Sequence, residues 1–150
     1  MGSYYFRKGQ YEKTYEQFSK AQKMMARATT TGYDFDNVNR LFLNDLVELC
    51  LILGKQKEAF KYLNRLAIAS SGFGKFGSTI SSNMEIARVF ELKSRCYLTS
   101  GDFKKAREYL EKANHYNPTS VAGSSVKLKL LRTEAILNWY EAPAEKVNFD

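Results

Sequence analysis

Apolar residues recur along the chain at the spacing of an α-helix almost throughout its length. In residues 40–53 they are Leu41, Phe42, Leu46, Leu49, Cys50 and Leu53, and residues 85–98 and 103–116 show similar steps of three and four. Such steps place the apolar side chains on one side of a helix. No useful window shows the alternation that is typical of a strand. The pattern predicts an all-α fold.

Glycine and short polar residues mark where the expected helices end and begin. Gly54 and Gly101 each follow a helical stretch, where a left-handed residue ends a helix at little cost. Asp102 is placed to cap the next helix through its side chain. The S-x-x-E pattern of residues 82–85 predicts a further helix start near Asn83.

The expected turns repeat along the chain. Gly9, Gly54 and Gly101 open three comparable turns, which lie 45 and 47 residues apart. Five residues after each glycine comes a small or short side chain, namely Thr14, Ala59 and Ala106. Self-similarity at such a period indicates a repeat architecture in which each repeat is one pair of helices.

Residues 87–120 resemble one complete tetratricopeptide repeat. The first helix carries the family's aromatic, small, small and aromatic positions as Phe90, Ser94, Cys96 and Tyr97. The second carries its small, large and small positions and the terminal proline as Ala106, Leu110, Ala113 and Pro118. In such a repeat, small residues let the two helices approach closely and large ones fill the groove between pairs.

The resemblance implies a fold of stacked antiparallel helix pairs, a tetratricopeptide-like α-solenoid with a right-handed superhelix. We expect one domain over residues 1–150, with repeats near 1–36, 37–82, 83–120 and 121–150. The period is longer than that of the family, and longer helices and loops would absorb the extra residues. Both ends read as parts of incomplete repeats, so we expect a segment of a longer protein, or a chain that associates through its terminal helices around Trp139, Tyr140 and Tyr4.

The resemblance also implies a protein- or peptide-binding module, acting as a scaffold or as the input segment of a sensor or regulator. Family members contact ligands through the first helix of each pair. Carried over to this chain, those positions form an exposed stripe on the concave face, made of Arg88, Glu91, Arg95 and Leu98, with Asn44 and Glu48 in the preceding repeat. The two arginines would each hold a carboxylate of an extended peptide. The alternative is a solvated stripe in which Glu91 pairs with one of them.

The formal net charge of +7 predicts a solvated basic surface, with a preference for acidic partners as the alternative. The excess is greatest in residues 61–100, where six basic residues stand against two acidic ones. A nucleic-acid-binding helical protein is an alternative, but the chain has no run of five like charges of the kind found in nucleic-acid-binding arms. The high aromatic content is expected in the core rather than in a base-stacking platform.

The sequence offers little catalytic or metal-binding chemistry, so we expect a non-enzyme without metal or cofactor; the regulatory domain of an enzyme is the alternative. Cys50 and Cys96 fit a buried core, and His115 is the only histidine. Residues 72–77 match G-x-G-x-x-G without the strand that a nucleotide site requires, so an inter-repeat loop, or a loop that folds over a partner, is expected. No leader or membrane-spanning pattern occurs, which favours a cytoplasmic location.

Overall fold

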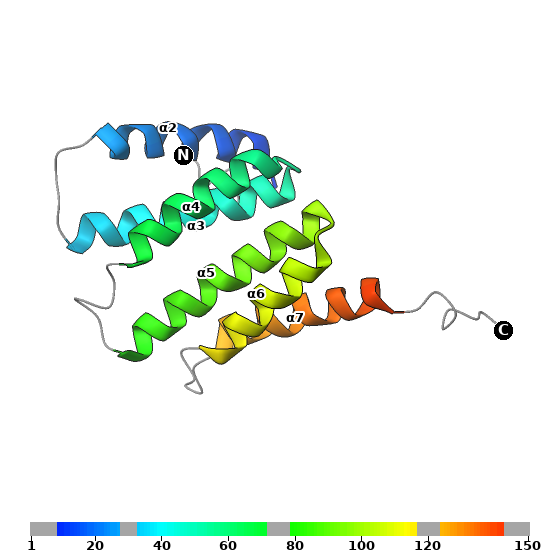
Figure 1. The fold of residues 1–150 in the computed structure, drawn as a ribbon. Coiled ribbons are helices and arrows are strands. Elements are labelled where there is room, and N and C mark those ends of the chain that lie inside the picture. Colours follow the sequence, from blue (N-terminus) through cyan, green and yellow to red (C-terminus); the bar gives the residue numbers. More distant parts are fainter. Residues whose placement is uncertain (1–8, 28–32, 72–78, 117–123, 143–150) are drawn as a thin grey trace. The chain divides into compact units, whose positions relative to one another are not determined.

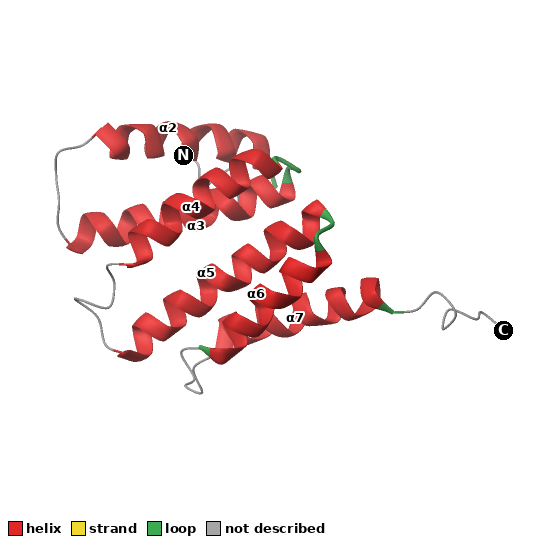
Figure 2. Cartoon of the chain, in the orientation of Figure 1, coloured by secondary structure: helices red, strands yellow, loops and turns green. Residues whose placement is uncertain are grey.

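The computed structural model of the chain describes residues 9–27, 33–71, 79–116 and 124–142. Six helices make up nearly all of these residues, and no strand occurs among them (Figures 1 and 2). The all-α fold predicted from the sequence is confirmed. The chain divides into two compact units, residues 1–82 and residues 83–150. The division falls between the second and third of the expected repeats, and the single-domain organisation stays a prediction.

The first unit is built around α3 (Tyr33–Ile52), which packs along α4 (Gln56–Ser71) on one side. Helix α2 (Tyr11–Arg27) packs on α3 as well, with the rings of Phe18 and Phe42 edge to face at 5.1 Å between centroids. Leucines dominate the buried apolar side chains of this unit, which are Phe18, Leu43, Leu46, Val47, Leu49, Cys50, Ala59, Tyr62, Leu63 and Leu66. Each helix therefore contributes one apolar side, as its spacing predicts.

The second unit contains most of α5 (Thr79–Ser100), together with α6 (Phe103–His115) and α7 (Ser124–Glu141). Helices α5 and α6 run antiparallel on either side of a short turn, and α7 packs on α6 (Figure 1). Their shared core consists of Ala87, Ala106, Leu110, Ala113, Val126, Leu130 and Leu137. Helix α6 thus supplies the small, large and small positions of the repeat motif to the centre of this core.

The turns at Gly54 and Gly101 have the same hydrogen-bond pattern. Both glycines are left-handed, with φ of 69° and 84°. At the first turn the backbone N–H of Lys55 donates to Cys50 O at 2.8 Å, and at the second Asp102 donates to Tyr97 O at 3.0 Å. This bond closes the end of the helix around a residue in the left-handed conformation, which glycine adopts without strain.

The position five residues after each turn glycine is fully buried. Thr14, Ala59 and Ala106 are each 0% exposed, and each donates its backbone N–H to the carbonyl oxygen four residues earlier at 2.9–3.1 Å. At Ala106 the burial reflects a close approach of the two helices, because Ser94 Oγ of α5 donates to the Ala106 carbonyl oxygen at 2.7 Å. A larger side chain at Ser94 or at Ala106 would separate α5 from α6. The repeat offset found in the sequence therefore marks a recurring close contact.

The start of α5 differs from the sequence prediction. The helix begins at Thr79 rather than near Asn83. Glu85, which the S-x-x-E pattern assigns to a capping box, instead accepts a hydrogen bond from Arg88 Nη1 at 2.8 Å. At α6 the predicted cap is confirmed, because Asp102 Oδ1 accepts from the backbone N–H of Lys105 at 3.1 Å. Pro118 lies outside the described residues.

The close contact at Ala106 generates the first prediction. Ala106→Leu forces extra methyl groups between α5 and α6, and we expect it to lower the free energy of unfolding by about 1–3 kcal/mol. Ala67→Leu is the matched control, since it makes the same change at an exposed position of α4. Urea unfolding followed by circular dichroism measures both. Equal stability of the two variants would show that Ala106 is not a packing contact.

Both cysteines are buried, as the sequence predicts. Burial raises the pKa of the Cys50 thiol from 9.0 to about 12. The folded chain therefore keeps this proton at pH values where the unfolded chain has lost it, and stability falls as pH rises above 9.

The second prediction follows from this thiol. Between pH 8 and pH 10, ionisation of the Cys50 thiol in the unfolded chain should remove about 1.4 kcal/mol from the free energy of unfolding. Cys50→Ala lacks the ionisable group and should show a shallower fall over the same range. Urea unfolding of both proteins at the two pH values provides the test. An equal fall in the free energy of unfolding in wild type and variant would show that the Cys50 thiol is not its cause.

Candidate functional site

Two of the residues predicted to form an exposed binding stripe on α5 are buried. Glu91 is 1% exposed and Arg95 is 9% exposed. Arg95 Nε lies 2.6 Å from Glu91 Oε1, and its Nη2 donates to Oε2 at 3.1 Å. Thr133 Oγ1 of α7 donates to Glu91 Oε1 at 3.2 Å. The expected exposure is wrong at both positions because α7 lies against this side of α5 and the charges pair there.

The other two positions of that stripe are also engaged. Arg88 Nη1 lies 2.8 Å from Glu85 Oε1, and only about a quarter of its side chain is exposed. Leu98 packs against the core of the second unit. An Arg95→Glu variant would bring a second carboxylate against buried Glu91, and breaking a buried ion pair costs about 3–5 kcal/mol. Such a variant reports on folding rather than on partner capture.

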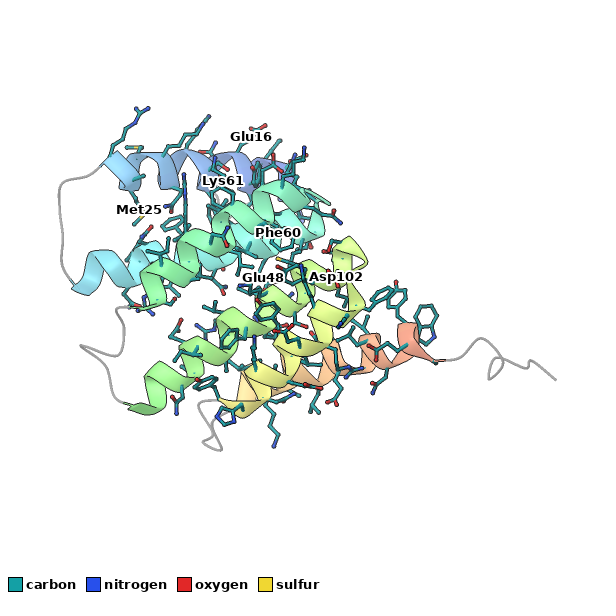
Figure 3. All side chains as sticks on the ribbon, viewed as in Figure 1. Glu16, Met25, Glu48, Phe60, Lys61 and Asp102 are labelled. Carbon is teal, nitrogen blue, oxygen red and sulfur yellow. The ribbon has the colours of Figure 1, made fainter. Side chains whose placement is uncertain are left out.

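In the first unit, Asn44 and Glu48 keep part of their surface exposed. Both lie on α3 and are half-buried, and Glu48 is labelled in Figure 3. The side-chain oxygen of Asn44 is buried without a hydrogen-bond partner among the described residues. Their role as partner contacts stays a prediction.

Helix α4 carries a row of exposed basic residues, which we name the α4 basic stripe. Its members, Lys57, Lys61 and Arg65, are four residues apart and so follow one side of the helix. None of the three forms an ion pair within the described part of the chain, and Arg65 lies 5.9 Å from the centroid of the Tyr62 ring. Lys61, at the centre of the row, is labelled in Figure 3. The stripe places three positive charges along one side of α4, next to a single carboxylate of the same helix, Glu58.

Four aromatic rings form a column between α5 and α6. Neighbouring rings stack with centroids 5.5–6.0 Å apart, in the order Tyr116, Phe90, Tyr109 and Tyr97. Lys93 and Lys112 place their ammonium groups 4.5 and 4.7 Å from the Tyr109 centroid. All four rings are half-buried. Because neighbouring rings and lysines contact them, the column packs the helix pair rather than offering open faces to nucleic-acid bases.

Two lysines beside the column, Lys105 over the Tyr97 ring and Lys112 over the Tyr109 ring, form ion pairs with carboxylates of the same unit. Lys112 Nζ lies 2.6 Å from Glu108 Oε1, and Lys105 Nζ lies 3.8 Å from Asp102 Oδ2. The hydrogen bond from Lys112 lowers the pKa of the Glu108 carboxyl and raises that of Lys112. Both side chains are solvated, so the pair contributes little to stability. An acidic partner meets less net charge here than along α4.

His115 is the remaining sequence candidate that the structure describes. His115 is exposed in the last turn of α6, with its ring edge to face with Tyr116 at 5.2 Å. Among the described residues no group of three or more His, Cys, Asp or Glu side chains is placed to hold a metal ion. No helix in the described part of the chain is both long and apolar enough to cross a membrane. The loop of residues 72–77 lies outside the described residues.

Sequence reasoning overlooked the α4 basic stripe. The spacing of its three residues is visible in the sequence, but the family resemblance assigns ligand contacts to the first helix of each pair, and α4 is a second helix. The sequence alone does not show which side of each helix is exposed. Along α5 the predicted side is covered, whereas along α4 the basic side is open.

A comparison with protein families agrees with the repeat geometry. The family model described as "Tetratricopeptide repeat" matches residues 87–120, which begin in α5 and contain all of α6. Comparisons with curated proteins and with solved structures found no match. The matched segment contains the Ser94–Ala106 contact and the Gly101 turn. The chain therefore contains a tetratricopeptide repeat, and its all-α fold of packed helices is of the tetratricopeptide-repeat type.

Proposed function

We propose that this chain is a protein-binding repeat module that captures an acidic segment of its partner along the α4 basic stripe. Tetratricopeptide repeats generally mediate protein interactions, which supports the first part of the proposal. The observation that carries the second part is the row formed by Lys57, Lys61 and Arg65, which form no ion pair with a described carboxylate. Uncompensated charge of one sign attracts a partner of the opposite sign and speeds its association.

The spacing of the stripe suits an extended acidic peptide. A step of four residues along a helix advances about 6 Å. In an extended peptide, residues on the same side are two apart, about 6.6 Å. Acidic residues at alternate positions of such a peptide therefore fall opposite successive members of the stripe. Arg65 can bind a carboxylate through two parallel hydrogen bonds, whereas Lys57 and Lys61 act as point charges.

The end of the stripe adds an apolar contact. Ile68 lies three residues beyond Arg65 and is 75% exposed. An exposed isoleucine at the end of a charged row favours a partner segment in which an apolar residue follows the acidic ones. Charge then guides association, and burial of this side chain slows dissociation.

A scaffold, or the input segment of a sensor or regulator, is the biological role we propose for such a module, on the resemblance to the repeat family alone. The chain acts in this proposal by binding and not by catalysis. A nucleic acid would also be attracted to the stripe, since its phosphates are anionic. Peptide binding is favoured because the rings of the aromatic column are half-buried and stacked on one another, which limits their contact with bases.

Self-association is a second proposed interaction. The residues of α7 that the sequence assigns to it, Trp139 and Tyr140, are 73% and 53% exposed. Tyr4, the third residue of that assignment, lies outside the described residues. The support for this interaction therefore comes from α7.

The third prediction tests the α4 basic stripe. The probe is a fluorescein-labelled peptide of alternating glutamate and serine, and its binding is followed by fluorescence anisotropy. We expect Lys61→Glu to weaken binding about tenfold, equivalent to about 1.4 kcal/mol. Lys20→Glu is the matched control, since Lys20 is exposed on α2 and the net charge changes equally. The control should lose less than about threefold, because it lowers only the general attraction.

Two outcomes would overturn this proposal. Equal loss in Lys61→Glu and Lys20→Glu would show that the peptide responds to net charge and not to the stripe. Tighter binding of a single-stranded oligonucleotide than of the peptide at matched salt, with the same sensitivity to Lys61→Glu, would identify a nucleic-acid-binding protein instead.

A further inference from the structure

Helix α7 is apolar on two opposite sides, and only one of them is packed. Its buried side consists of Val126, Leu130, Thr133 and Leu137, which face the core of the second unit. At 100° per residue, the opposite side consists of Leu128, Leu131, Ala135 and Trp139. Leu128, Leu131 and Trp139 are 68%, 53% and 73% exposed, and Ala135 is exposed as well. We name these four residues the exposed stripe of α7.

The carboxyl-terminal end of the exposed stripe is held in place by α6. Arg107 donates hydrogen bonds to Asn138 Oδ1 at 2.8 Å and to Glu141. The ring of Phe103 stacks on Tyr140 with centroids 5.2 Å apart, and Trp139 lies edge to face with Tyr140 at 5.0 Å. These contacts orient the last turn of α7 while Trp139 stays exposed. A large aromatic side chain that is already positioned loses little entropy when a partner covers it.

We propose that the exposed stripe of α7 pairs with the same stripe of a second copy of the chain, with the two helices antiparallel. This inference rests on the proposed self-association and adds its geometry. An antiparallel arrangement about a two-fold axis places Leu128 opposite the second copy's Trp139, and Leu131 opposite its small Ala135. A parallel arrangement would place the two tryptophans together and leave a gap between the two alanines. Alternation of large and small residues across a helix pair gives the closer packing.

The charges along α7 favour the same direction. Its first half carries Lys127, Lys129 and Arg132, and its second half carries Glu134 and Glu141, of which Glu141 is already paired with Arg107 of α6. Antiparallel pairing brings the basic half of one helix against the acidic half of the other, and it also opposes the two helix dipoles. Parallel pairing brings like charges together. Charge and side-chain size therefore select the same arrangement, which is a self-complementary two-fold interface.

The size of the stripe sets the expected strength of the pair. Stable complexes bury about 800 Å² on each partner. Four side chains on one helix provide less than that, so the dimer should be weak and reversible, with a dissociation constant in the micromolar range or above. The net charge of +7 on each copy opposes association at low salt. Moderate salt should therefore strengthen the dimer, whereas it weakens the capture of an acidic peptide.

Sedimentation velocity over a concentration series tests the surface. We expect wild type to shift from monomer to dimer as concentration rises, and Ala135→Glu to weaken dimerisation at least tenfold. Ala67→Glu, the same change at an exposed position of α4, is the matched control and should leave the dimer intact. A strictly monomeric wild type at millimolar concentration would overturn self-association. A dimer that Ala135→Glu leaves unchanged would place the interface elsewhere.

Cross-linking tests the direction. Leu131→Cys and Ala135→Cys are made in two separately tagged copies, which are mixed and treated with a short bis-maleimide. The antiparallel pair predicts a mixed product that links position 131 of one copy to position 135 of the other. Cys50 and Cys96 are buried and should react slowly. Products linking 131 to 131 and 135 to 135, without the mixed one, would overturn the antiparallel arrangement. Peptide binding is measured on Ala135→Glu in parallel, so failure of the dimer and failure of the peptide site give separate results.

Discussion

The close approach of paired helices at small side chains is the contact on which the rest of this structure depends. At Ala106 the distance is set by Ser94, whose hydroxyl reaches the backbone of the opposite helix at 2.7 Å. The left-handed glycine five residues earlier reverses the chain tightly enough for that approach. The same offset produces buried Thr14 and Ala59 in the first unit. A turn and a small residue at fixed separation thus determine where each second helix lies, and so which sides of the helices remain exposed.

This packing decides which charges are available to a partner. On α5 the proximity of α7 turns Glu91 and Arg95 into a buried pair that Thr133 completes. A pair of this kind contributes little net stability when intact, yet it is costly to break. Its consequence is that Glu91 and Arg95 of α5 are paired and buried against α7, so neither charge is exposed to a partner. On α4, by contrast, Lys61 and its two neighbours in the α4 basic stripe remain exposed.

Much of the fold could be predicted from the sequence, because it rests on local signals. Helical spacing, the glycine turns, the Asp102 cap and the buried cysteines are each set by a few neighbouring residues. The binding surface depends on contacts between distant residues, such as Thr133 with Glu91, forty-two positions apart. No local pattern predicts such a contact, so the stripe on α5 was predicted to be exposed. The start of α5 differed for a local reason, since Glu85 pairs with Arg88, three residues later on the same helix, instead of capping.

We propose that partner capture occurs on α4 and not on the predicted side of α5. The most direct measurement is a nitrogen-15 nuclear magnetic resonance titration of the whole chain with the glutamate–serine peptide, which reports on each backbone amide separately. The account predicts that shift changes concentrate in residues 57–68 and that the amides of Glu91 and Arg95 stay unperturbed. Changes centred on Arg88, Glu91 and Arg95, with none along α4, would contradict it.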